Sequence, residues 1–209
     1  MEYALFMTLG LIHMAGLISP GPDFALVLKN STDMSRKLAL ISATGIALGV
    51  ATHATLSVTG VSLLIQQSET LYAIIQWGGI GYLAWLGGTT LKSVFSQAWA
   101  PTSQAPAVKK GRWQALSLGY LTNLLNPKAL MYFIGMVAAI VPAQLSMQNR
   151  IWLIVELFLL TLLWFGGLAY ALSSPSVQTY IRKVEKGLNL ITGVLFVLLA
   201  FALAINTMR

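Results

Sequence analysis

Two ionisable side chains of opposite charge, Asp23 and Lys128, lie within apolar stretches of this sequence, and each follows a proline. Asp23 belongs to the run Ser19-Pro20-Gly21-Pro22-Asp23-Phe24, and Lys128 ends the run Asn126-Pro127-Lys128. Proline interrupts a helix, and a charged group at membrane depth is costly unless it serves a purpose. An acid and a base brought together in lipid could bind the ammonium and the carboxylate of one small molecule.

Each motif can start a new half-helix inside the membrane. Such a start has free backbone N–H groups and a partial positive charge. Asn126 is a good N-cap and Pro127 suits the first helical position, whereas in the other motif Ser19 is expected to cap, Pro20 to open the helix and Asp23 to lie in its first turn. A lysine in a first turn is disfavoured, so the second motif should need an anion beside it, either the aspartate or a bound substrate.

The composition is that of an integral membrane protein. Of 209 residues, 56% are hydrophobic and 9% are charged, whereas a soluble domain carries about 25% charged residues. The net charge of +7 comes from basic residues scattered between apolar runs, so these residues indicate orientation rather than a nucleic-acid surface. Cysteine is absent and the two histidines are far apart, so no disulfide, metal site or cofactor is expected.

About six hydrophobic stretches are each long enough to cross the ~30 Å hydrocarbon core of a bilayer. They run over residues 3–28, 38–65, 71–91, 115–141, 151–172 and 187–205. The first is longer than the apolar region of a signal peptide and lacks a small-residue cleavage site, so it should remain as a span. These stretches predict an all-α membrane protein with six transmembrane helices, the first and fourth of which are broken.

Basic residues are concentrated in alternate connections. They follow the first, third and fifth stretches, at Lys29, Arg36, Lys37, Lys92, Lys109, Lys110, Arg112, Arg182, Lys183 and Lys186. The connection after the second stretch has no basic residue, and the one after the fourth has only Arg150. Because cytoplasmic loops carry the excess of lysine and arginine, both termini are predicted on the periplasmic side.

The connection over residues 93–113 is rich in Ser, Gln, Ala and Pro and divides the chain into two groups of three spans, residues 1–92 and 114–209. It is expected to be a cytoplasmic linker. Because three is odd, the second group enters the membrane from the opposite side, as in the inverted repeats of secondary transporters. The first spans of the two groups also match, since Leu17-Ile18-Ser19-Pro20-Gly21 aligns with Leu124-Leu125-Asn126-Pro127-Lys128.

Glycines mark the remaining spans as scaffold. They form a GxxxG pair at Gly45 and Gly49 and small-residue surfaces at Gly78, Gly79, Gly81, Gly87 and Gly88 and at Gly166 and Gly167. Close helix packing is the expected role, with a gating hinge at Gly166-Gly167 as the alternative. The glycines of the third span could pack within one protomer or across a homodimer.

These features together resemble the LysE/RhtB family of bacterial amino-acid exporters, which includes the lysine and the homoserine/threonine efflux proteins. The resemblance covers the whole chain and rests on Ser19-Pro20-Gly21-Pro22-Asp23 and on Asn123-x-x-Asn126-Pro127-Lys128-Ala129. His13 and Ser35-Arg36-Lys37 are most similar to the threonine-exporting branch. The resemblance implies a secondary transporter of the bacterial inner membrane that exports small amino acids from the cytoplasm, driven by the proton-motive force.

The central residues are complementary to an α-amino acid, which carries one carboxylate and one ammonium group. Lys128 and the two half-helix starts could hold the carboxylate, Asp23 could hold the ammonium, and neutral side chains could add hydrogen bonds. The expected substrate-binding residues are Ser19, Pro20, Gly21, Asp23, Asn123, Asn126, Pro127 and Lys128.

Proton coupling requires a group that can change its charge inside the protein, and a membrane-buried carboxylate qualifies. Asp23 is the first candidate, because protonation would weaken its hold on an ammonium group. His13 and Glu156 are the further candidates. Glu156 follows Arg150 closely enough that an interfacial, water-reachable carboxylate is the simpler interpretation.

Simpler roles for these residues stay open. Asp23 could only cap a kinked helix, Lys128 could pair with Asp23 as a structural clamp, and His53 fits a buried, hydrogen-bonded histidine better than a ligand. A divalent-cation or other small-solute exporter of the same fold is the alternative function, although a central lysine argues against a cation site. A passive channel also stays open, whereas no nucleophile–base motif of an enzyme is present. The sequence does not identify the amino acid.

Overall fold

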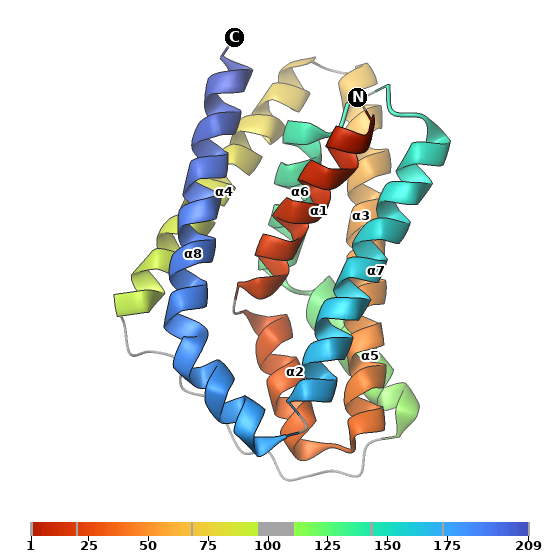
Figure 1. Cartoon of the computed structure of the whole chain (residues 1–209). Coiled ribbons are helices and arrows are strands. Elements are labelled where there is room, and N and C mark those ends of the chain that lie inside the picture. Colours follow the sequence, from red (N-terminus) through yellow and green to blue (C-terminus); the bar gives the residue numbers. More distant parts are fainter. Residues whose placement is uncertain are drawn as a thin grey trace.

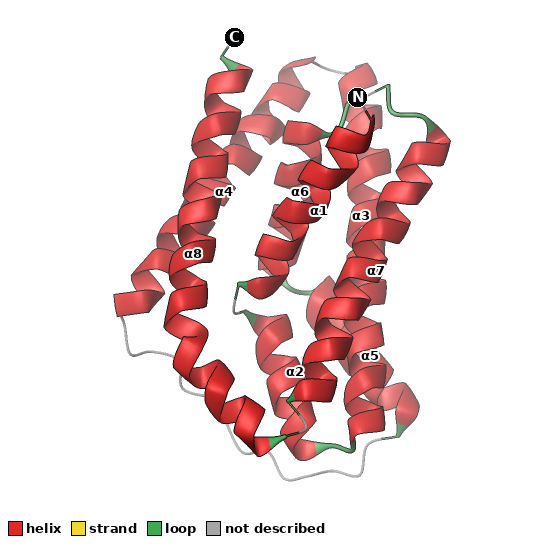
Figure 2. Cartoon of the chain, viewed as in Figure 1, coloured by secondary structure: helices red, strands yellow, loops and turns green. Residues whose placement is uncertain are grey.

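The computed structural model describes residues 2–19, 21–67, 69–95, 111–142, 144–172 and 174–208. Within these ranges the chain consists of α-helices joined by short turns and loops and contains no strand (Figures 1 and 2). Its helices are α1 (Glu2–Ile18), α2 (Pro22–Asp33), α3 (Arg36–Gln67), α4 (Glu69–Phe95), α5 (Arg112–Leu124), α6 (Pro127–Ile140), α7 (Met147–Ala171) and α8 (Pro175–Thr207). The predicted all-α fold is confirmed, and most of the predicted linker lies outside the described residues.

The two predicted breaks are present. Helices α1 and α2 follow one another at an angle of 59°, and α5 ends at Leu124 before α6 begins at Pro127. Both breaks occur at prolines, which cannot supply the N–H that a continuous helix needs. The long helices α3, α7 and α8 have no internal proline and are unbroken.

Helices of the two halves of the chain pack against each other. Helix α3 lies against α5 and α7, and α4 lies against α6 and α8. Glycine permits these close approaches: a Cβ on Gly45 would collide with the backbone of Leu116, and one on Gly79 would collide with the backbone of Gly135. Gly87 likewise faces the backbone of Gly193. The predicted packing role of Gly45 is therefore confirmed, and Gly79 and Gly87 share it.

The other predicted packing glycines differ. A Cβ on Gly78, Gly81 or Gly88 would meet no atom of the described residues within 4 Å, so this face of α4 is open in the part of the chain that the structure describes. The expectation of close packing at Gly166-Gly167 was wrong for the described residues, because a Cβ on Gly166 would lie 4.0 Å from Cδ2 of Leu40 and one on Gly167 would meet no described atom within 4 Å. The pair lies in a helix face that is not closely packed, so it gives no close helix contact.

The core consists of two clusters of buried apolar residues. One includes Leu9, Leu83 and Phe133 and joins α1, α3, α4, α6, α7 and α8. The other includes Phe24 and Phe165 and joins α1, α2, α3 and α7. The second cluster adjoins the α1–α2 break, because Leu17 and Phe24 lie on either side of it.

The outer surface is apolar, as exposed Leu163 on α7 and Phe201 on α8 illustrate. Among the described residues, three helices are long and apolar enough to cross a membrane alone, over Arg36–Gly60, Met147–Ala171 and Asn189–Thr207. The bent pair α1–α2 is a fourth crossing if it counts as one span. The remaining two of the six predicted crossings, α4 and the pair α5–α6, stay a prediction.

Both ends of the chain lie at one end of the helix bundle (Figure 1). The α2–α3 connection and the start of α5 lie at the opposite end (Figure 1). This opposite end carries Arg36 and Arg112 at the helix starts. Arg36 and Arg112 thus lie at the end away from the termini, while the side of the membrane that each end faces stays a prediction.

Candidate functional site

Helix α2 starts two residues later than the sequence suggested. Gly21 is the N-cap, with φ −168° and ψ −169°, and Pro22 is the first helical residue. The N–H of Ala25 donates to the carbonyl of Gly21 at 2.9 Å, which closes the first turn. The expectation that Ser19 caps this helix was wrong, because Ser19 still belongs to the end of α1, where its N–H donates to Ala15 at 3.2 Å. Pro20 lies outside the described residues.

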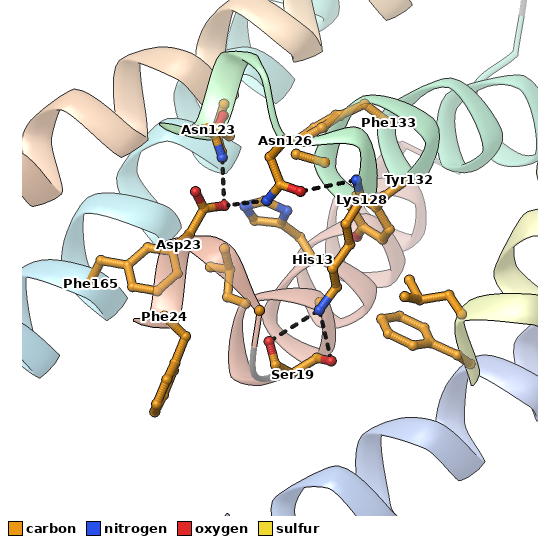
Figure 3. A pocket seen from close by; sticks show the side chains of 17 residues that line it. His13, Ser19, Asp23, Phe24, Asn123, Asn126, Lys128, Tyr132, Phe133 and Phe165 are labelled. Atoms are coloured by element: carbon orange, nitrogen blue, oxygen red, sulfur yellow. Dashed lines mark hydrogen bonds between the residues drawn. The ribbon is translucent and has the colours of Figure 1, made fainter. Parts of the chain in front are cut away.

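Asp23 lies in the first turn of α2, as predicted. Its Oδ2 accepts hydrogen bonds from the side-chain amides of Asn123 at 2.9 Å and Asn126 at 3.2 Å. Its Oδ1 is buried and has no hydrogen-bond partner among the described residues. The carboxylate therefore faces the α5–α6 break and keeps one oxygen for another donor (Figure 3).

The start of α6 agrees with the sequence. The side-chain oxygen of Asn126 accepts from the backbone N–H of Lys128 at 3.0 Å, and Pro127 is the first helical residue. Because the oxygen of Asn126 caps α6, its amide nitrogen is directed to Asp23. The side chain of Asn126 thus caps α6 and contacts Asp23 of α2.

Lys128 reaches across to the end of α1. Its Nζ donates to the carbonyl of Ser19 at 3.2 Å and to the hydroxyl of Ser19 at 2.9 Å (Figure 3). A Cβ on Gly21 would lie 3.2 Å from Nζ, which is tighter than an ordinary contact. Glycine at this position leaves room for the lysine beside the break.

These residues line one pocket, whose empty volume of about 490 Å³ includes the space at its mouth. Its polar wall consists of His13, Ser19, Gly21, Asp23, Asn123, Asn126 and Lys128. The structure therefore brings together Ser19, Gly21, Asp23, Asn123, Asn126 and Lys128 of the sequence-predicted residues. Pro20 and the side chain of Pro127 lie outside the described part of the chain.

An aromatic wall completes the pocket and was missed by sequence reasoning. It comprises Phe24, Tyr132, Phe133, Phe165 and Phe196. Tyr132 could have been found, because it lies one helical turn after Lys128 and so shares its face of α6. The phenylalanines of α7 and α8 could not, because nothing in uniformly apolar helices says which face is turned inward.

The two further proton-coupling candidates occupy different places. His13 lines the pocket and lies 2.8 Å from the hydroxyl of Thr161, measured from Nε2. Glu156 is half-buried on α7 and faces Gly10, where a Cβ would lie 2.8 Å from Oε1. Glu156 is not part of the described pocket wall. A role for either residue in coupling stays a prediction.

His53 is a buried, hydrogen-bonded histidine, as predicted. Its Nε2 donates to the backbone carbonyl of Asn123 at 3.1 Å, and its ring stacks on Phe133 at a centroid distance of 5.9 Å. This contact supports the end of α5, where helical carbonyls lose their intrahelical partners. His53 thus stabilises the α5–α6 break from α3.

Among the described residues, no group of three or more His, Cys, Asp or Glu side chains could hold a metal ion. The pocket instead offers a carboxylate, an ammonium group and neutral amides. Such a set binds groups of both charges rather than a bare cation.

The sequence is similar to those of known exporters. Residues 14–207 match the family model described as LysE type translocator. The chain is 32% identical to the threonine efflux protein of Escherichia coli (strain K12) over 194 residues, which cover 92% of this chain and 93% of the relative. It is 31% identical to the threonine efflux protein of Salmonella typhi, over 92% and 93% of the two chains.

A second group of relatives carries another substrate in its name. The chain is 30% identical to the arginine exporter protein ArgO of Salmonella schwarzengrund (strain CVM19633) over 198 residues, which cover 93% of this chain and 91% of the relative. No solved structure matches the chain. The relatives are exporters rather than enzymes, and the match extends over nearly the whole sequence. This chain belongs to the LysE type translocator family.

Proposed function

We propose that this protein exports small amino acids from the cytoplasm across the bacterial inner membrane in exchange for protons. The observation that carries the proposal is that Asp23 and Lys128, at the starts of two half-helices from opposite halves of the chain, line the same pocket. Relatives named for threonine efflux and arginine export support the substrate class.

The ammonium group of the substrate is assigned to Asp23. Its Oδ2 is occupied by two amides, whereas its buried Oδ1 has no partner among the described residues. A buried carboxylate oxygen normally accepts a hydrogen bond, and an ammonium group brings three donors. The amides of Asn123 and Asn126 hold the carboxylate in place while this bond forms.

The carboxylate of the substrate is assigned to Lys128 and to the positive start of α6. Lys128 donates to Ser19, and a carboxylate would compete for this donor because a charge-assisted hydrogen bond is stronger than one to a neutral oxygen. Ser19 then serves as the partner of Lys128 in the absence of substrate.

Proton exchange is assigned first to Asp23. A proton that reaches Asp23 from the periplasmic side neutralises it, weakens its hold on the ammonium group and so favours release outside. Of the two further candidates, His13 lines the same pocket as Asp23, whereas Glu156 lies beside Gly10 of α1.

The architecture proposed for this cycle has six crossings in two inverted groups, residues 1–92 and 114–209, with both termini periplasmic. In an inverted repeat, α5 corresponds to α1 and α6 corresponds to α2. The contact of α1 with α6 should then have a counterpart between α5 and α2, and both contacts are present. The same correspondence relates α3 to α7 and α4 to α8, which pack as pairs. A homodimer through the open glycine face of α4 is also proposed.

The experiment is export of labelled amino acids from intact cells, with and without an uncoupler, by the wild-type protein and by Asp23→Asn. Wild-type export should fall when the proton gradient is removed, and Asp23→Asn should abolish export while the protein still inserts. Because asparagine has the shape of aspartate, loss of export would report the charge. Uncoupler-insensitive export would contradict proton exchange, and normal export by Asp23→Asn would remove this residue from the mechanism.

A further inference from the structure

The pocket contains buried polar atoms that the proposed binding of the two charged groups does not use. The hydroxyl of Tyr132 and Nδ1 of His13 have no hydrogen-bond partner among the described residues. Both residues line the pocket, and their side chains are only 5% and 1% exposed. Buried hydroxyl and imidazole groups are normally paired, so unpaired ones in a pocket wall indicate a ligand group.

Tyr132 lies against the part of α1 that carries His13. A Cβ on Gly16 would lie 3.6 Å from the hydroxyl oxygen of Tyr132, and Gly16 follows His13 by one turn of α1. The rings of His13 and Tyr132 have a centroid distance of 6.2 Å. The Tyr132 hydroxyl therefore faces the stretch of α1 that carries His13.

The surroundings of this hydroxyl are apolar. Phe133 meets the Tyr132 ring edge-on at 5.4 Å, and Phe196 lies 6.3 Å from it between ring centroids. Both phenylalanines line the pocket. A ligand group in this region therefore meets aromatic walls and the two unpaired polar atoms.

The hydrogen-bonding roles of the two atoms follow from Thr161. The hydroxyl of Thr161 donates its proton to the carbonyl of Leu157 at 2.7 Å, so it can only accept from His13 Nε2 at 2.8 Å. Neutral His13 then carries its proton on Nε2, and its Nδ1 is an acceptor. The region thus offers a donor on Tyr132 and an acceptor on His13, which complements a hydroxyl group because a hydroxyl both accepts and donates.

We propose that Tyr132 and His13 form a side-chain subsite that selects small neutral amino acids bearing a hydroxyl group, such as serine, threonine and homoserine. This inference rests on the proposed function and names its substrate class. Of the described residues that line the pocket, Asp23 is the only acid, and it is assigned to the α-ammonium group. A second cationic group, as in arginine or lysine, would find no anionic partner there and would be costly to bury.

The test compares threonine with valine, which has the same shape but a methyl group in place of the hydroxyl. The full chain is reconstituted in proteoliposomes loaded with unlabelled amino acid, and uptake of each labelled amino acid is measured by exchange at low concentration without a proton gradient. Wild-type protein should prefer threonine. Tyr132→Phe should lower the threonine-to-valine ratio by about tenfold, the worth of one hydrogen bond to a buried group.

A matched control is Tyr82→Phe, which removes a hydroxyl from a half-buried tyrosine of α4 that is not part of the described pocket wall. It should leave the ratio unchanged. Gly16→Ala is the second variant, since its Cβ would make an ordinary contact of 3.4 Å with the Tyr132 ring. By narrowing the subsite it should lower exchange of homoserine more than that of serine.

The outcomes separate the subsite from the transporter. An unchanged threonine-to-valine ratio in Tyr132→Phe would overturn the subsite, and so would wild-type exchange of arginine as fast as threonine. A wild-type protein that exchanges no amino acid would instead overturn the proposed function on which the subsite rests.

Discussion

The two helix breaks carry opposite charges and are held in place differently. At the α5–α6 break, Asn126 caps α6 with its own side chain, and His53 binds the carbonyl of Asn123 from α3. At the α1–α2 break, the N-cap is Gly21, which makes no side-chain cap. There the carbonyl and hydroxyl of Ser19 are bonded by Lys128 from the other break.

This difference indicates that the α5–α6 break is preformed. The α5–α6 break has its cap and its supporting histidine built into its own sequence and into α3, so it should persist when the pocket is filled. The α1–α2 break shares its lysine with the proposed substrate carboxylate. We therefore expect substrate binding to change the α1–α2 break more than the α5–α6 break.

Among the variants that test the contrast between the two breaks, the largest expected effect comes from Lys128→Met, which keeps the length of the side chain and removes its charge. It deprives Ser19 of its donor and leaves Asp23 without the nearby cation, so exchange of amino acids should fall at least about thirtyfold, because loss of one member of a buried charge pair costs about 2 kcal/mol or more. The measurement is exchange in proteoliposomes at equal protein content.

Lys92→Met is the matched control for this change. Lys92 is exposed in the last turn of α4, outside the described pocket wall, so its variant should keep wild-type exchange. Wild-type exchange by Lys128→Met would show that the lysine does not bind the substrate carboxylate.

A smaller effect is expected at Asn126, where two variants divide its two roles. Asn126→Ser keeps a side chain that can cap α6 but is too short to donate to Asp23, whereas Asn126→Ala loses both contacts. Loss of the cap should lower stability by about 1 kcal/mol, seen as a lower unfolding temperature in detergent for Asn126→Ala than for Asn126→Ser. Both variants should bind amino acids more weakly than the wild type. Equal unfolding temperatures for the two variants would argue against the cap as the support of this break.

Both breaks could be predicted from the sequence, because proline interrupts a helix and asparagine favours the cap position at a helix start. Asn126-Pro127 identified the start of α6 correctly, since its cap is a side chain. The start of α2 was placed too early, because Ser19-Pro20-Gly21-Pro22 offers two prolines and a capping glycine has no side chain to reveal it. Local signals thus locate a break, and tertiary contacts decide which residue begins the helix.

The pocket itself was predicted only on its polar side. Charged and amide residues are rare in apolar helices, so Asp23, Asn123 and Lys128 stood out, whereas Phe165 and Phe196 did not. Which face of α7 or α8 turns inward depends on the rotation of a long apolar helix against its neighbours, and composition does not encode that rotation. Partners of close glycines, such as Gly79 with Gly135, were hidden for the same reason.

The smallest expected effect comes from Ser19→Ala, and it tests the contrast between the breaks most directly. The variant removes the hydroxyl that competes with a substrate carboxylate for Lys128 and keeps the Ser19 carbonyl, so amino-acid exchange at low concentration should rise roughly fivefold, as expected for one hydrogen bond worth about 1 kcal/mol. Amide hydrogen exchange should become faster in the first turn of α2 and stay unchanged in the first turn of α6, because Asn126 still caps the latter. Ser31→Ala, which removes a buried hydroxyl bonded to Val27 within α2, should leave transport unchanged. Faster exchange at both breaks in Ser19→Ala would mean that they are one cooperative unit, and the separate support of the α5–α6 break would then not explain its stability.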